Sequence, residues 1–237
     1  GNRNWTAARE AELQADFWGT DIDLLKPIIQ HGGSDSASLD NALEVLTMSG
    51  RSILHAMSML VPPAWRSEKN IPQPIADFFE YHRCFCEPWD GPAALCFTDG
   101  LMAAACLDRI GLRPARYMLT DEGVFCLGSE VGISGIDLRH VVEMGRLAPG
   151  EMIAVDTVGG RLLHDADIKA MLAARKPYGE WVEKNLVRFE HSDAQKIPAP
   201  SGELDILTLT QRQIAFGYSS EELDIVLKPM FKDGAEA

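Results

Sequence analysis

The stretch AALCFTDGLMAAACLD, residues 93–108, decides the fold class of this chain. It contains two apolar runs that meet at Asp99-Gly100, and an Asp-Gly pair between apolar runs predicts a β-hairpin. Residues 115–129, ARYMLTDEGVFCLGS, and residues 152–165, MIAVDTVGGRLLHD, repeat this arrangement. Three successive hairpins predict a largely antiparallel sheet. Its strands are apolar almost throughout, so we expect other layers to cover both faces.

Helical patterns on both sides of the hairpins supply these covering layers. Residues 4–18 are rich in Ala and Glu and carry a partial apolar stripe. A helix over 52–61 is expected to stop at Pro62 and Pro63, and Pro74 suits the first turn of the helix that follows. The remaining predicted helices cover residues 36–48, 75–86 and 165–189, the last one broken near Pro177. The chain is therefore predicted to belong to the α+β class.

The composition is that of an acidic globular protein. The 237 residues include 22 Lys and Arg against 35 Asp and Glu, a net charge of −13, with 46% hydrophobic residues. This charge and the lack of a polybasic run exclude nucleic acid and membrane surfaces as expected partners. No apolar run reaches the length of a membrane span, and the N-terminal residues have no signal-peptide core. The odd number of cysteines, five, favours a reducing compartment, so we expect a cytoplasmic protein.

The chain is predicted to contain one domain followed by part of another. Residues 1–190 form the first domain, and the polar, proline-containing stretch 191–202, HSDAQKIPAPSG, is typical of a linker. Residues 203–237 contain two short helical patterns, the second capped by Ser219 or Ser220. About 35 residues are too few for a domain, so this stretch is expected to begin a further region.

The sequence HGGSDSASLDNAL, residues 31–43, holds more capping residues than one helix needs. Ser34, Asp35 and Ser36 can each bind orphan amides at a helix start, and Gly32-Gly33 allows a sharp turn before it. Two interpretations of Asp35 stay open from the residues alone. It is either part of a helix cap or a carboxylate presented to a ligand.

The cysteines do not form a recognisable metal or nucleophile motif. On a helix His82 and Cys86 would share a face while Cys84 points away, so no metal site is expected. The other three cysteines fall in strand-like apolar runs, where we expect buried and unreactive thiols: Cys96, Cys106 and Cys126.

A charged turn follows the first hairpin, in DRIGLRPARY, residues 108–117. We interpret it as a structural corner in which Gly111 allows an unusual backbone angle and Asp108 pairs with Arg109 or Arg113. Direct contact of these residues with a ligand is the less favoured alternative.

A series of motifs in this order resembles the glutamate synthase large subunit, in the later part of its class II glutamine amidotransferase domain and the start of its central region. The motifs are GNRNW (1–5), HGGSDSASLDNALE (31–44), MLVPPAW (59–65), FFEYHRCFCEPWDGPAAL (78–95), LDRIGLRPARY (107–117), SEVGI (129–133), KPYGEWVEKNLVRF (176–189) and FGYSSEELDIVLKPM (216–230). The resemblance implies part of a four-layer αββα N-terminal-nucleophile hydrolase fold with antiparallel sheets. It also implies release of ammonia from glutamine by an N-terminal Cys, for conversion of 2-oxoglutarate to glutamate.

Carried onto this chain, the G-G-S-D-S motif implies that Asp35 binds the α-amino group of glutamine. A carboxylate accepts charge-assisted hydrogen bonds from an ammonium. Gly33 and Ser34 are then expected in the same substrate site, with Gly32 and Ser36 as its structural support.

The resemblance also places several functional groups outside residues 1–237. The Cys nucleophile and the oxyanion Asn-Gly are expected upstream of GNRNW, so we expect the chain to be inactive alone. No cofactor is expected in the chain, and FMN and an iron–sulfur cluster are implied for the rest of the parent protein. Expected partners are glutamine, the missing N-terminal segment, the central and synthase domains, a small subunit or ferredoxin, and a second copy of the chain. The alternative is a free-standing, non-catalytic module for glutamine sensing or subunit interaction.

Overall fold

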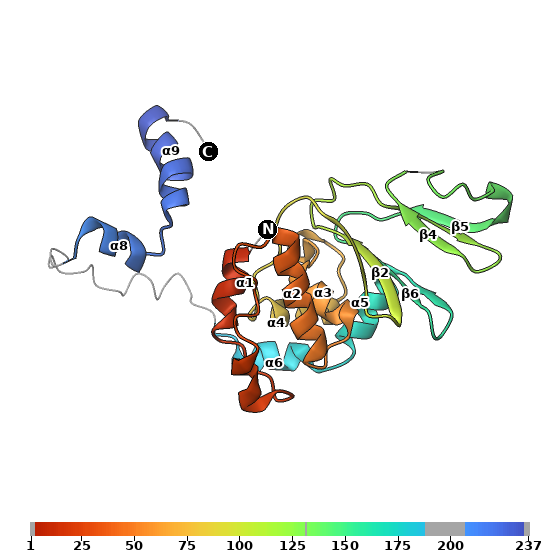
Figure 1. The fold of residues 1–237 in the computed structure, drawn as a ribbon, viewed down its shortest axis with the longest axis horizontal. Coiled ribbons are helices and arrows are strands. Elements are labelled where there is room, and N and C mark those ends of the chain that lie inside the picture. The colour runs from red at the N-terminus through yellow and green to blue at the C-terminus, as the bar shows by residue number, and fades with distance from the viewer. Residues whose placement is uncertain (1–2, 131, 188–206, 235–237) are drawn as a thin grey trace. The chain divides into compact units, whose positions relative to one another are not determined.

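The structure is a computed structural model that describes residues 3–130, 132–187 and 207–234. The chain divides into two units, Gly1–Leu186 and Val187–Ala237, and the first of them contains two β-sheets and the helices around them (Figure 1). The predicted linker, 191–202, lies outside the described residues. None of the helices in the described ranges is long and apolar enough to cross a bilayer.

The helices of the first unit follow most of the predicted pattern. Ser52 caps α3 by accepting the amide of His55 at 3.4 Å, α3 ends ahead of the two prolines, and Pro74 lies in the first turn of α4. The helices are α1 (Arg3–Glu10), η1 (Gly19–Leu24), α2 (Asp35–Met48), α3 (Ile53–Leu60), η2 (Trp65–Ser67), α4 (Gln73–His82), η3 (Leu138–His140), α5 (Asp165–Ala173) and α6 (Tyr178–Asn185).

Two predicted helices are shorter than expected. The helix expected over 4–18 ends at Glu10, because its apolar stripe does not continue into a buried face: Phe17 is 70% exposed. The helix expected over 75–86 ends at His82. His82, Cys84 and Cys86 are therefore not on one helix, and the argument that used helical geometry to judge them as metal ligands was wrong in that premise.

The three predicted hairpins are confirmed, but they belong to two sheets. One sheet has the strand order β1-β2-β6-β7 and the other β4-β3-β5, and all neighbours in both are antiparallel. The strands are β1 (Ala94–Thr98), β2 (Met102–Leu107), β3 (Arg116–Thr120), β4 (Phe125–Gly128), β5 (Val141–Arg146), β6 (Met152–Asp156) and β7 (Arg161–Leu163). Strand β5 was not predicted, although its burial alternates along VVEMGR as expected for a half-covered strand.

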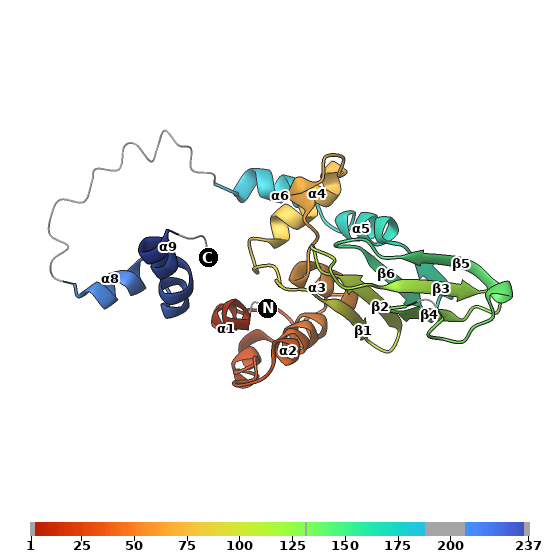
Figure 2. The ribbon, with the colours of Figure 1, turned by 90° about the horizontal axis from the view of Figure 1, so that it is seen from above.

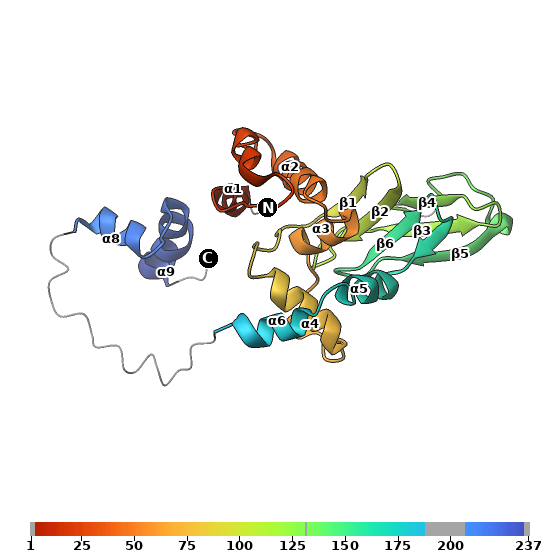
Figure 3. The same ribbon diagram turned by 90° about the horizontal axis from the view of Figure 1, so that it is seen from below.

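Side chains from the β1-β2-β6-β7 sheet enter two separate cores. Ala104 and Cys106 of β2 pack with helices α2 to α5, whereas Ala105 and Leu107 pack with the β4-β3-β5 sheet. Successive residues of a strand face opposite sides, so this sheet is covered on both faces as predicted. Figures 2 and 3 show α3 and α5 beside β6 and β2, with β3, β4 and β5 beyond them.

The β4-β3-β5 sheet has a partly open outer face among the described residues. Val142 and Met144 of β5 are 63% and 56% exposed, and Met118 lies between Met144 and Cys126 in the strand register. The described residues therefore cover this face only in part, and full covering of both faces stays a prediction for this sheet. The first unit consists of a helical layer and two stacked sheets.

The second unit contains α8 (Leu209–Ala215), the π-helix η5 (Glu222–Leu227) and α9 (Lys228–Asp233). Ser219 is the predicted cap: its hydroxyl accepts the amide of Glu222 at 3.1 Å, and the Glu222 carboxylate accepts the amide of Ser219 at 2.8 Å. Large apolar side chains in this unit are exposed, with Phe216 at 70% and Phe231 at 93%.

Candidate functional site

The loop before α2 presents Asp35 at the start of a well-capped helix. Ser34, and not Asp35, is the N-cap, because its hydroxyl accepts the amide of Ala37 at 3.2 Å. Asp35 is the first helical residue and its side chain is exposed. Negative charge is favoured in the first turn of a helix, where the amide dipoles point toward it. Asp35 is thus not needed as the cap, and it is an exposed residue at the start of the helix.

The glycines and serines around Asp35 hold the loop in one shape. Gly32 has φ +76, a conformation that favours glycine, and a Cβ on Gly33 would lie only 3.2 Å from the Gln30 carbonyl oxygen. The Ser34 and Ser36 hydroxyls lie 3.0 Å apart in a hydrogen bond. The structure therefore brings together the five residues predicted at this site: Gly32, Gly33, Ser34, Asp35 and Ser36.

Asp108 forms a structural corner, but not by the predicted pairing with an arginine. It is 1% exposed, and its carboxylate accepts the amides of Ala93 at 2.9 Å, Ile110 at 2.8 Å and Gly111 at 3.2 Å. Buried carboxylates satisfied by backbone amides need no cation. Asp108 therefore fixes the turn itself.

The other residues of this corner have structural or exposed positions. Gly111 has φ +66 and a Cβ there would lie 2.6 Å from Pro149 Cγ, so the site requires glycine. Arg109 pairs with Asp90. Arg113 is exposed. The corner is a support element at the end of β2.

The cysteines differ in exposure, and two have thiols of raised pKa. Burial raises the pKa of the Cys106 thiol to about 12 and that of Cys86 to about 11, so neither is a thiolate at neutral pH. Cys96 is exposed on the edge strand β1 and Cys126 is half-buried, which corrects the expectation of burial for these two. The described residues contain no group of three or more possible metal ligands.

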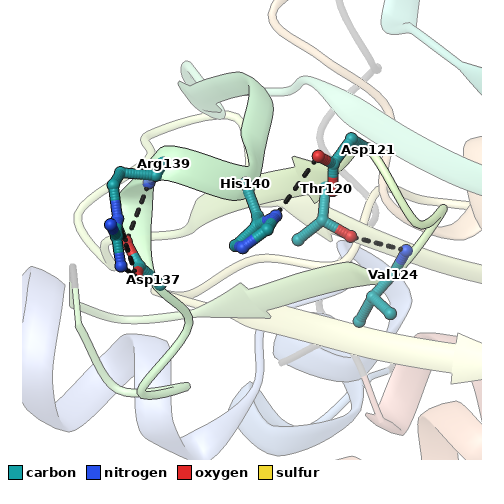
Figure 4. A network of polar contacts seen from close by, with 6 residues as sticks. All are labelled: Thr120, Asp121, Val124, Asp137, Arg139 and His140. Carbon is teal, nitrogen blue, oxygen red and sulfur yellow. Dashed lines mark hydrogen bonds and ion pairs between the residues drawn. The ribbon is translucent and has the colours of Figure 1, made fainter.

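A polar network joins the β3–β4 turn to the segment before β5 (Figure 4). His140 Nδ1 donates to the Asp121 carboxylate at 3.2 Å, and the Asp121 amide donates to the His140 carbonyl at 2.9 Å. Asp137 caps η3 and binds Arg139, which lowers the pKa of the Asp137 carboxyl. Asp121, Asp137, Arg139 and His140 are exposed, and the Thr120 hydroxyl accepts the amide of Val124 at 3.0 Å within the β3–β4 turn. The network therefore orders the end of this sheet.

Sequence analysis missed a buried histidine pair between α3 and α4. The Nε2 atoms of His55 and His82 lie 2.7 Å apart, and His82 Nδ1 lies 2.7 Å from the Phe78 carbonyl oxygen. A carbonyl only accepts, so His82 carries its proton on Nδ1 and His55 donates through Nε2. The one signal in the sequence was two histidines among apolar residues, 27 positions apart.

The sequence that forms this α+β architecture and its Gly-Gly-Ser-Asp loop matches the model of a known protein family. The family model of class II glutamine amidotransferases matches residues 1–181. The chain belongs to this family, as the resemblance of its motifs implied.

The relatives that the chain matches over its whole length are glutamate synthases. It is 42% identical over 240 residues to ferredoxin-dependent glutamate synthase 2 of Synechocystis sp.. It is 41% identical over 237 residues to the glutamate synthase [NADPH] large chain of Azospirillum brasilense, and 39% over 236 residues to that of Bacillus subtilis. These alignments cover 100% of this chain and 15 to 16% of the relatives.

Proposed function

We propose that this chain is part of the glutaminase domain of a glutamate synthase and that Asp35 binds the α-ammonium group of glutamine. The observation that carries this proposal is the exposed Asp35 carboxylate in a preformed loop of a class II glutamine amidotransferase chain. A carboxylate that is already held in place binds an ammonium without losing side-chain and loop entropy on binding.

The neighbouring residues have defined roles in this proposal. Gly33 has no side chain above the loop, so its backbone can approach the substrate closely, and Ser34 holds the helix start against which glutamine lies. Gly32 and Ser36 support the loop conformation. Asp108, Arg109, Gly111 and Arg113 support the sheet and do not contact substrate.

The chemical step belongs to a cysteine outside these 237 residues. Cys86 and Cys106 are protonated at neutral pH, and the sequence resemblance assigns the nucleophile to an N-terminal Cys whose own amine is the base. The released ammonia would then convert 2-oxoglutarate to glutamate in other parts of the parent protein. FMN and an iron–sulfur cluster would be held there, with electrons from ferredoxin or NADPH, the donors in the names of the Synechocystis and Bacillus subtilis relatives.

A fourth, helical layer over the β4-β3-β5 sheet completes the proposed αββα arrangement. The outer face of this sheet has a groove of about 250 Å³, whose floor includes Met118, Cys126 and Met144. An apolar groove on an exposed sheet face is the kind of surface that another layer covers. The exposed apolar side chains of the second unit are proposed to pack in the same way against the central region.

Calorimetric titration of the chain with glutamine tests the role of Asp35. Replacing an ammonium-binding carboxylate removes a charge-assisted hydrogen bond, so Asp35→Asn should weaken binding about tenfold to a hundredfold. Asp40→Asn is the matched control, because Asp40 is exposed on the same helix but faces another direction. Equal affinity of Asp35→Asn and the unmodified chain would contradict the proposal.

A further inference from the structure

Three consecutive backbone amides just before the Asp35 loop are all bound by side chains. Oε2 of Glu10 accepts the amide of Ile28 at 2.9 Å and that of Ile29 at 2.8 Å. Oδ1 of Asn41 accepts the amide of the next residue, Gln30, at 3.1 Å. Glu10 is the last residue of α1, and Asn41 lies in the second turn of α2. The segment 28–30 is therefore held between two helices.

Ile29 is buried in the main hydrophobic core, and the hydrogen bonds to Glu10 and Asn41 fix the backbone of this segment beside it. A cavity of about 240 Å³ lies beside it, lined by Glu10, Ile28 and Ile29 together with Ala42 and Leu46 of α2. A side chain next to an empty space lacks the contacts that fix it in a filled core. Loss of Glu10 or Asn41 would leave backbone amides of the segment without their acceptors, and the neighbouring cavity gives the backbone room to shift.

Hydrogen bonds connect Gln30 to the turn that precedes Asp35, so the position of Gln30 affects that of Asp35. The Gln30 carbonyl accepts the amide of Gly33 at 3.1 Å, which closes the turn directly before the cap residue Ser34. On the other side, the fully buried Ser38 donates its hydroxyl to the Ser34 carbonyl at 3.1 Å. The loop is thus anchored at both ends, and Glu10 and Asn41 provide the anchor at its first end.

We propose that Glu10 and Asn41 are positioning residues for glutamine recognition, which hold the Asp35 carboxylate where it meets the α-ammonium group. The inference rests on the proposed function, because Glu10 and Asn41 affect glutamine binding only if Asp35 binds the ammonium group. Neither residue touches the substrate. If the loop is released, only a fraction of molecules is competent to bind, and the apparent affinity falls by that fraction.

The test compares glutamine with 4-carbamoylbutanoate, which is glutamine without its α-amino group. The dissociation constant of 4-carbamoylbutanoate divided by that of glutamine, both measured by calorimetry, reports the contact with the ammonium alone. Asn41→Leu and Glu10→Leu remove the acceptors and should reduce this ratio about tenfold. Asn41→Asp and Glu10→Gln keep an acceptor oxygen and should restore it, and Asp40→Asn should leave it unchanged. A general loss of stability would not change the ratio in variants that are folded by circular dichroism.

The outcomes separate this inference from the proposed function. A ratio that falls in Asp35→Asn but is unchanged in both leucine variants overturns the positioning roles and leaves the role of Asp35 intact. A ratio that is unchanged in Asp35→Asn overturns the proposed function and the inference with it. Absence of glutamine binding by the unmodified chain overturns both as well.

Discussion

The buried pair of His55 and His82 should make the first unit sensitive to mild acid. The two side chains are 8% and 4% exposed, and His82 must be neutral because its Nδ1 donates to the Phe78 carbonyl while its Nε2 accepts from His55. Burial lowers the pKa of His55 from 6.5 to about 3 and that of His82 to about 4. These values include smaller effects in the same direction, from the charges of His82, Arg51 and Arg175 on His55 and of Arg51 on His82, while the hydrogen bond to the Phe78 carbonyl raises the pKa of His82. Tyr81 of α4 and Tyr178 of α6 pack against the His82 ring.

The size of the effect follows from the difference in pKa between the unfolded and folded states. The unfolded chain binds protons at these histidines below about pH 6.5, whereas the folded chain does not until about pH 4, so stability is full above 6.5 and falls as the pH decreases. Each histidine contributes about 1.4 kcal/mol per pH unit within that window. Between pH 7 and pH 5 the pair should therefore lower the free energy of unfolding by about 3 to 4 kcal/mol.

Urea unfolding followed by circular dichroism at pH 7 and pH 5 measures this difference. The double variant His55→Phe/His82→Phe has no titrating pair, and its free energy of unfolding should depend on pH by about 3 kcal/mol less than that of the unmodified chain. His31→Asn is the matched control, because His31 is exposed. The reasoning is refuted if the double variant and the unmodified chain lose the same free energy between the two pH values.

Other perturbations address the supports of the fold. Gly111→Ala should lower the free energy of unfolding by more than about 2 kcal/mol, because positive φ and the contact with Pro149 both oppose a Cβ. Gly123→Ala, with positive φ but open space, should cost about 1 kcal/mol in the same urea titration. Asp108→Ala leaves three amides without their acceptor and should cost at least about 3 kcal/mol, and a smaller loss would contradict its role as the corner. Burial raises the pKa of Glu80, but hydrogen bonds from two arginines outweigh it and lower the pKa to about 2. Glu80→Gln should therefore remove a stabilisation that is present above pH 4.5 and is lost toward pH 2, measured as the change in melting temperature with pH.

Turn and helix-stop signals in the sequence predicted local structure correctly at several positions. The Asp99-Gly100 turn defined its hairpin because both strands lie beside it in the chain, and Pro62 ended α3 because proline lacks an amide. Strand β5 was missed since its partner β3 is more than 20 residues away and no turn connects the two directly. The division into two sheets depends on the same kind of distant pairing.

The candidate site shows the same limit. The cap at Ser34 and the position of Asp35 beside it could be read from the order of residues 32–36. The binding of Gln30 by Asn41, and of the preceding amides by Glu10, could not, because the partners come from different helices. The predicted pairing of Asp108 with an arginine was wrong, because three backbone amides donate to its carboxylate instead. One of them, that of Ala93, lies 15 residues away in the sequence.

The order of strands also has a consequence for how the chain folds. Strands β2 and β6 are neighbours, yet the connection between them contains the whole of the β4-β3-β5 sheet. Bringing distant segments together costs loop entropy, which is smaller once the intervening chain has already folded. We expect β3, β4 and β5 to pair first and to act as a ready-made short bridge between β2 and β6. The β1-β2-β6-β7 sheet would then form last, after the β4-β3-β5 sheet is complete.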